Sequence, residues 1–188
     1  QSKGSTFNPS IGINSLFLYQ NNSVNSENDG FQIQEMEMQF VSNVDSYFLV
    51  NALLAIRPEE GEFIIEPEEA FVETTSLPQV TFRFGKFRMA MGKHNQRHTH
   101  AYPFIKAPLA QSTYLGEEGL QETGFSLRYL VPTPWYQELT LQVVQGDNED
   151  LFNNDNKDVH AGLMHLANFF ELTGATTMEV GLSGMSGE

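Results

Sequence analysis

The residues best suited to chemistry lie in one histidine-rich stretch. Residues 93–100 (KHNQRHTH) hold three of the five histidines. In an extended chain, His98 and His100 would point to the same side, because they are two residues apart. Neutral imidazole is a good ligand for zinc, copper or nickel. The stretch therefore contains a candidate metal site, whose ligands would be His94, His98, His100, Glu117 and Glu118.

A second interpretation of these histidines involves no metal. They could line the entrance of a water-filled opening, or they could hydrogen-bond the loop that carries them to the neighbouring strands. Lys93 and Arg97 favour this alternative, because both would repel a cation. We therefore predict no resident cofactor and keep zinc as a candidate only.

A further set of charged side chains lies on segments with a two-residue repeat. Seven of the ten basic residues fall between Arg83 and Arg128. If these segments are strands of a membrane barrel, an Arg or Lys that faces lipid at the middle of the bilayer costs about 2–4 kcal/mol. Such charges should therefore face the lumen of the barrel. The predicted lumen-lining residues are Glu35, Glu37, Glu69, Glu73, Arg83, Lys86, Arg88 and Arg128. Alternatively, they form salt bridges that fill a small closed barrel.

The segments that carry these charges read as β-strands. In residues 31–42 and 46–57, apolar and polar side chains alternate, as on a strand with one apolar face. At 79–91, strict alternation would put Phe82 and Phe84 on the same face as Lys86 and Arg88. This conflict predicts a bulge near Gly85 that resets the alternation. A helix over 161–172 is the alternative to a strand there. We predict about nine strands: 9–20, 31–42, 46–57, 63–75, 79–91, 122–131, 136–146, 159–170 and 175–185.

Short and long connections alternate between these strands. Tight turns at 43–45, 76–78, 132–134 and 172–174 alternate with long polar links such as 92–121. An up-and-down antiparallel transmembrane β-barrel has this layout, with the longer loops outside. Bacterial single-chain barrels have an even number of strands, so about nine suggests the N-terminal part of a longer barrel. We treat residues 1–188 as one barrel domain.

Composition excludes several classes of function. The net charge of −14 argues against nucleic-acid binding, which needs a cationic surface. The absence of cysteine excludes disulfides and thiolate metal sites. No nucleophile elbow and no phosphate-binding glycine loop is present, so we do not expect an enzyme.

Several segments resemble one family. They are residues 7–13 (FNPSIGI), 69–73 (EAFVE), 84–87 (FGKF) with 98–100 (HTH), and 124–133 (GFSLRYLVPT). Their order resembles porin-like outer-membrane β-barrel proteins of Gram-negative bacteria, some of them labelled zinc-regulated or similar to TonB-dependent receptors. The resemblance implies an outer-membrane location, contact with lipid and lipopolysaccharide, and a link to zinc. It covers only the first half of the expected barrel.

The leading functional prediction is a porin-like channel for passive passage of small polar or ionic solutes, with a charged lumen and acidic external loops. One alternative is a structural or adhesive outer-membrane protein whose loops bind a partner. Another is a soluble all-β ligand-binding domain. The oligomeric state and contacts with other envelope proteins are left open.

Overall fold

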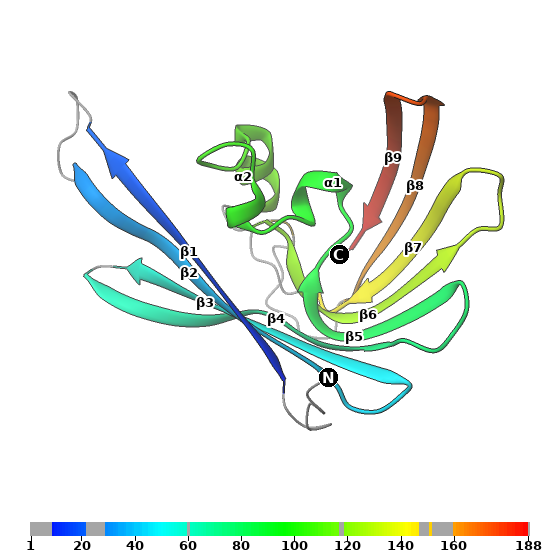
Figure 1. The fold of residues 1–188 in the computed structure, drawn as a ribbon, viewed down its shortest axis with the longest axis horizontal. Helices are drawn as coiled ribbons and strands as arrows, with labels where there is room; N and C mark the ends of the chain where they lie inside the picture. Colours follow the sequence, from blue (N-terminus) through cyan, green and yellow to red (C-terminus); the bar gives the residue numbers. More distant parts are fainter. Residues whose placement is uncertain are drawn as a thin grey trace.

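The protein is a single antiparallel β-sheet with one long excursion between two of its strands. The computed structural model describes residues 9–21, 29–59, 61–116, 119–146, 151 and 160–187. Nine strands follow one another in the sheet in chain order (Figure 1). They are β1 (Ser10–Gln20), β2 (Gly30–Asn43), β3 (Phe48–Glu59), β4 (Glu62–Thr74), β5 (Val80–Arg88), β6 (Gln121–Leu130), β7 (Tyr136–Val144), β8 (Ala161–Thr173) and β9 (Thr176–Ser186).

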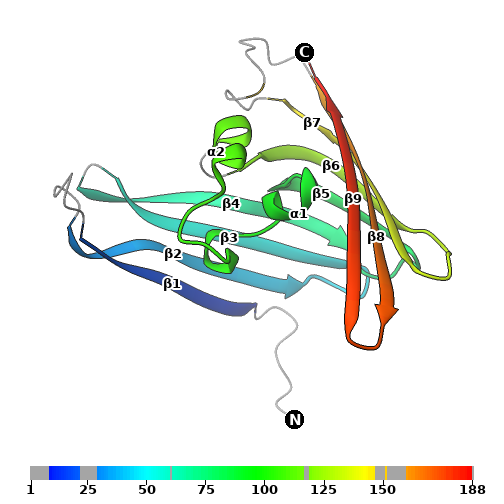
Figure 2. The same cartoon turned by 90° about the horizontal axis from the view of Figure 1, so that it is seen from above.

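This arrangement confirms the all-β, up-and-down part of the prediction. Residues 161–173 are a strand and not a helix. The strands are 9–14 residues long, against a usual mean of about five to six. Over the described residues, the sheet is open: β1 and β9 are its two edges and do not pair with each other. A closed barrel is therefore not observed, although the sheet is strongly curved (Figures 1 and 2).

The two faces of the sheet have opposite polarity. The concave face carries ladders of polar side chains, such as Arg128, Thr140 and His165 on adjacent strands. The convex face carries apolar ladders, such as Phe84, Phe125 and Val143, which are 58%, 48% and 56% exposed. An antiparallel sheet in water commonly has its apolar face covered, whereas large apolar side chains on the convex face of this sheet are exposed in the described residues.

A bulge in β4 keeps polar side chains on the concave face where the two-residue repeat of the sequence is interrupted. The register between β3 and β4 shifts at Leu53/Leu54, where Glu68 and Glu69 lie opposite Leu53. Both glutamates are buried, at 1% and 9% exposure. The extra residue in β4 thus directs two consecutive carboxylates to the concave side, as a bulge can.

The predicted bulge near Gly85 is wrong. The pairing of β5 with β4 and with β6 runs through Gly85 without a shift. Gly85 has φ of +131°, and a Cβ there would lie 2.2 Å from the Ala70 carbonyl oxygen. Glycine is needed because the neighbouring backbone comes too close for any side chain. Phe82, Phe84 and Lys86 therefore do share the convex face.

The connection between β5 and β6 does not extend outward as a simple external loop. Residues 89–120, here called the inward segment, cross the concave side of the sheet (Figure 2). They contain three short helices: α1 (Gly92–Asn95), η1 (Thr99–Ala101) and α2 (Leu109–Leu115). Hydrogen bonds join the segment to widely separated strands, from Gln34 of β2 to Ser183 of β9.

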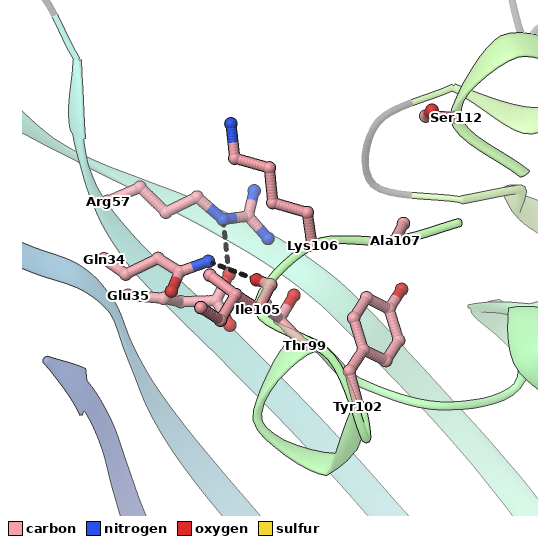
Figure 3. Close-up of a pocket in the computed structure, with 9 residues that line it drawn as sticks. All are labelled: Gln34, Glu35, Arg57, Thr99, Tyr102, Ile105, Lys106, Ala107 and Ser112. Carbon is pink, nitrogen blue, oxygen red and sulfur yellow. Dashed lines mark hydrogen bonds and ion pairs between the residues drawn. The ribbon is translucent and has the colours of Figure 1, made fainter. Parts of the chain in front are cut away.

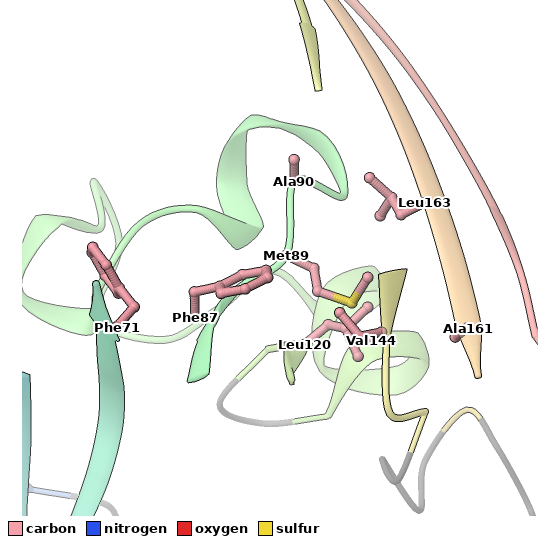
Figure 4. Close-up of a cluster of buried hydrophobic side chains, with 8 residues drawn as sticks. All are labelled: Phe71, Phe87, Met89, Ala90, Leu120, Val144, Ala161 and Leu163. Atoms are coloured by element: carbon pink, nitrogen blue, oxygen red, sulfur yellow. The ribbon is translucent and has the colours of Figure 1, made fainter. Parts of the chain in front are cut away.

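A small apolar core anchors the two ends of the inward segment. Met89 and Leu120 are fully buried, as is Phe87 of β5. They pack with side chains of β4, β7 and β8 on the concave face (Figure 4). The complete cluster is Phe71, Phe87, Met89, Ala90, Leu120, Val144, Ala161 and Leu163.

The buried side-chain amide of Asn95 hydrogen-bonds to both ends of the inward segment. The Asn95 Nδ2 donates to the carbonyl oxygens of Met89 and Leu120, at 2.8 and 3.0 Å. Its Oδ1 accepts from the Leu120 backbone N–H at 2.7 Å. Buried backbone groups need such partners, so Asn95 replaces the strand pairing that ends here.

In the described part of the chain, no helix combines the length and apolar character needed to cross a membrane.

Gly119 provides a test of this anchor. Its φ is +78°, and a Cβ would lie 2.6 Å from Asn95 Oδ1. We expect Gly119→Ala to lower the free energy of unfolding by about 1–3 kcal/mol, measured by denaturant titration. The matched control is Gly174→Ala, because a Cβ there has nothing within 4 Å. Equal stability of the two variants would contradict the role given to Gly119.

Candidate functional site

Charged side chains gather where the inward segment meets β2, β3 and β4. We call this group the buried charge cluster: Glu35, Glu37, Arg57, Glu68, Glu69, Arg88, His98 and His100. Four carboxyl groups, two guanidinium groups and two imidazoles thus share one region of the concave face.

Glu68 lies at the centre of the cluster. Its side chain is 1% exposed and is held by both guanidinium groups. Arg57 Nη2 contacts Glu68 Oε1, and Arg88 Nη2 lies 3.2 Å from Glu68 Oε2. Arg57 also donates from Nε to Glu35 Oε2 at 2.6 Å. A carboxylate this deeply buried requires such charged partners.

His98 brings the inward segment to the same carboxylate. Its Nδ1 lies 3.0 Å from Glu68 Oε2, and its Nε2 lies 3.6 Å from Glu69 Oε2. Burial opposes the imidazolium charge, but the hydrogen bonds to Glu68 and Glu69 outweigh it and raise the pKa of His98 to about 9. The charged ring donates from Nδ1 to Glu68. The 3.3 Å approach of Arg88 Nε to Nδ1 is then a contact between two donors, not a hydrogen bond.

Glu37 and His100 form the other side of the cluster. The His98 and His100 rings are stacked, with centroids 5.9 Å apart and planes 2° from parallel. Burial and the neighbouring His98 charge lower the pKa of His100. Neutral His100 places Nδ1 2.5 Å from Glu37 Oε2. Neither oxygen of Glu37 has a partner in hydrogen-bonding geometry, although the residue is only 2% exposed.

A cavity of about 290 Å³ opens beside the cluster. Glu35 and Arg57 line its strand side, and Thr99 and Tyr102 of the inward segment line the other (Figure 3). The Gln34 side chain donates to the Ile105 carbonyl oxygen at 3.3 Å across it. Small polar solutes or ions can therefore reach the edge of the cluster.

A basic patch lies on the far side of the inward segment. Arg83 and Arg128 both donate to Glu73 Oε2, at 2.9 and 3.1 Å. The Arg83 guanidinium also stacks 3.8 Å from the centre of the Phe71 ring. A second cavity, of about 240 Å³, is lined by Arg83 and Arg128 together with Glu69, Arg88 and His98 of the buried charge cluster. Charges of both signs therefore line the described part of the concave face.

The charged residues predicted to line a lumen do not all lie on the same face of the sheet. Glu35, Glu37, Glu69, Glu73, Arg83, Arg88 and Arg128 all lie on the concave side of the sheet. Lys86 does not: it pairs with Ala70 on the convex face, and its Nζ donates to the Pro67 carbonyl oxygen at 2.8 Å. The prediction for Lys86 is wrong, because no bulge at Gly85 turns it inward.

The histidine candidates also separate. His98 and His100 are adjacent in the cluster, as expected from their spacing. His98 has extended backbone geometry just before a short 3-10 helix, and His100 lies within that helix. His94 instead packs against Tyr102, with ring centroids 4.5 Å apart. Glu117 and Glu118 lie outside the described residues. The ligand atoms that come together belong to Glu37, Glu68 and His98.

Sequence reasoning missed Arg57 and Glu68 as site residues. The doublet Glu68-Glu69 interrupts the two-residue repeat of its strand, and this interruption was the available signal for a bulge. The pairing of Arg57 with Glu68 depends on strand register, which the pattern alone does not determine.

Comparison with known proteins adds one relative. No protein-family model matches the chain. The chain is 34% identical over 139 residues to an uncharacterized protein of Aquifex aeolicus (strain VF5). The matched region is 73% of this chain but only 29% of that protein. The chain thus spans less than a third of the length of this relative, and the name of the relative indicates no activity.

Glu68 is the residue whose loss should cost most. We expect Glu68→Gln to lower the free energy of unfolding by about 3–5 kcal/mol, because it removes the buried carboxylate that Arg57, Arg88 and His98 all contact. Glu66→Gln is the control, because its carboxylate is 51% exposed and lies 3.5 Å from Arg57. The control should change stability by about 1 kcal/mol or less. A smaller loss for Glu68→Gln than for Glu66→Gln would contradict the central role of Glu68.

Proposed function

We propose that this chain forms the wall of a porin-like outer-membrane channel, through which small polar or ionic solutes pass passively. The observation that carries the proposal is the inverted polarity of the sheet. Charged and polar side chains are buried on the concave face, while large apolar side chains are exposed on the convex one. Lipid around the convex face and water inside would satisfy both.

The extent of exposed apolar surface supports a lipid environment. Phe17, Phe31 and Leu182 are 74%, 90% and 74% exposed, and they lie on three different strands. Monomeric soluble proteins rarely expose contiguous apolar patches larger than a few hundred Å². Strands of 9–14 residues also match the length needed to cross a bilayer at a tilt.

A soluble sandwich fits these observations less well. It would bury Phe48 and Val50 against a second sheet, yet they are 43% and 38% exposed. The described residues form one sheet only. Closure belongs to the same proposal: further strands, pairing with the free edges of β1 and β9, would complete the barrel.

In this channel the inward segment would narrow the lumen. It contacts the buried charge cluster through His98 and, with Gln96, lines the cavity that Arg83 and Arg128 also line. Fixed charges of both signs in a narrow passage select among solutes through their field. Small zwitterionic or ionic solutes are therefore the class that such a lumen would favour.

Conductance of the purified full-length barrel in a planar lipid bilayer tests the channel. We expect stepwise, ohmic conductance, and in a salt gradient we expect Arg128→Gln to shift the reversal potential towards cations, because it removes a positive charge from the wall. Lys86→Gln is the matched control on the convex face and should leave the potential unchanged. Absence of any conductance would refute the channel and leave a structural or adhesive barrel.

Lipid contact can be tested separately. Val143 lies on the convex face and is 56% exposed. If it faces lipid, Val143→Arg should lower the free energy of unfolding in vesicles by about 2–4 kcal/mol. Thr177→Arg, next to the β8–β9 turn, serves as the control and should cost far less. No difference between the two variants would favour a water-exposed convex face.

A further inference from the structure

The carboxyl group of Glu37 is buried in the charge cluster without a hydrogen bond to either oxygen. It is 2% exposed, and His100 Nδ1 lies 2.5 Å from its Oε2 but outside hydrogen-bonding geometry. Glu35 Oε1, on the next inward position of β2, is likewise buried without a hydrogen bond. Buried carboxyl oxygens in this state lose their hydration without compensation. Their lone pairs are therefore free to bind a metal ion.

The charges of the cluster are compatible with a bound cation. Glu35, Glu37, Glu68 and Glu69 bring four carboxyl groups together, and their positive partners are Arg57, Arg88 and the protonated ring of His98. Both guanidinium groups contact Glu68, and neither forms a hydrogen bond with Glu37. Imidazole binds metal in its neutral form, so a divalent ion would displace the proton of His98. The two positive charges of the ion would then balance the carboxylates of Glu37 and Glu68.

We propose that Glu37, Glu68 and His98 bind a divalent first-row transition-metal ion. One ligand atom from each residue lies within 4.8 Å of the other two. Zinc sites with nitrogen and oxygen ligands use bonds of about 2.0–2.2 Å, so small side-chain rotations would bring all three atoms onto one ion. Glu35 Oε1 or water is available for a fourth position.

The donor set indicates which ions would bind. An imidazole with carboxylates suits zinc, iron, nickel or manganese, whereas magnesium and calcium prefer oxygen ligands alone. The ligands come from β2, β4 and the inward segment, so a bound ion would also pin that segment to the sheet. The cavity lined by Glu35 and Arg57 gives an approach from the concave side. The site does not depend on channel activity.

Calorimetric titration of the folded, purified protein with ZnCl₂ tests this site. We expect one high-affinity zinc ion per chain and no comparable binding of Mg²⁺. Glu37→Gln and His98→Gln should each weaken zinc binding by at least about 10-fold. His94→Gln is the matched control, because His94 lies in the same segment but packs against Tyr102 outside the ligand set. Its affinity should equal that of the unaltered protein.

Three results would overturn the proposal: no zinc binding by the unaltered protein, unchanged affinity in Glu37→Gln, or an equal loss in His94→Gln. Should the variants fail to fold, zinc X-ray absorption of the unaltered protein decides. The expected spectrum contains imidazole scattering together with oxygen ligands. A spectrum without imidazole scattering would exclude His98 and refute the site. Conductance is a separate readout, so loss of zinc binding and loss of channel activity remain distinguishable.

Discussion

The buried carboxylate of Glu68 connects the parts of the molecule that give the concave face its character. It contacts Arg57 of β3, Arg88 at the end of β5 and His98 of the inward segment, while itself being 1% exposed. A charge buried to this degree is stable only when its partners are held in place. The bulge that turns Glu68 inward therefore determines where the inward segment docks and where the other charges gather.

The contacts of Glu68 lie on the polar, concave face of the sheet, and the apolar side chains of the convex face are exposed. A polar concave face with few apolar anchors leaves room for cavities on either side of the inward segment. The compact apolar core lies near the ends of that segment, around Met89 and Leu120. Away from this core, hydrogen bonds and ion pairs hold the described part of the concave face.

The strands could be predicted closely from sequence, whereas the site could be predicted only in part. The two-residue repeat located all nine strands, and strand parity placed Glu35, Glu37 and Arg83 on the inner face. It placed Lys86 on the wrong face, because the prediction assumed a bulge at Gly85 that the backbone does not have. The pattern also could not show that residues 89–120 fold inward, since that depends on Asn95 and on contacts with distant strands.

The sequence by itself determined the class of fold, the polarity of the two faces and the proximity of His98 to His100. These follow from alternation and from near-neighbour spacing, which are local properties of the chain. Only the tertiary structure decided that His98 meets Glu37 and Glu68 while His94 packs against Tyr102. The contacts of His98 with Glu37 and Glu68 join residues at least thirty positions apart, and they depend on strand register and on the bulge at Glu68.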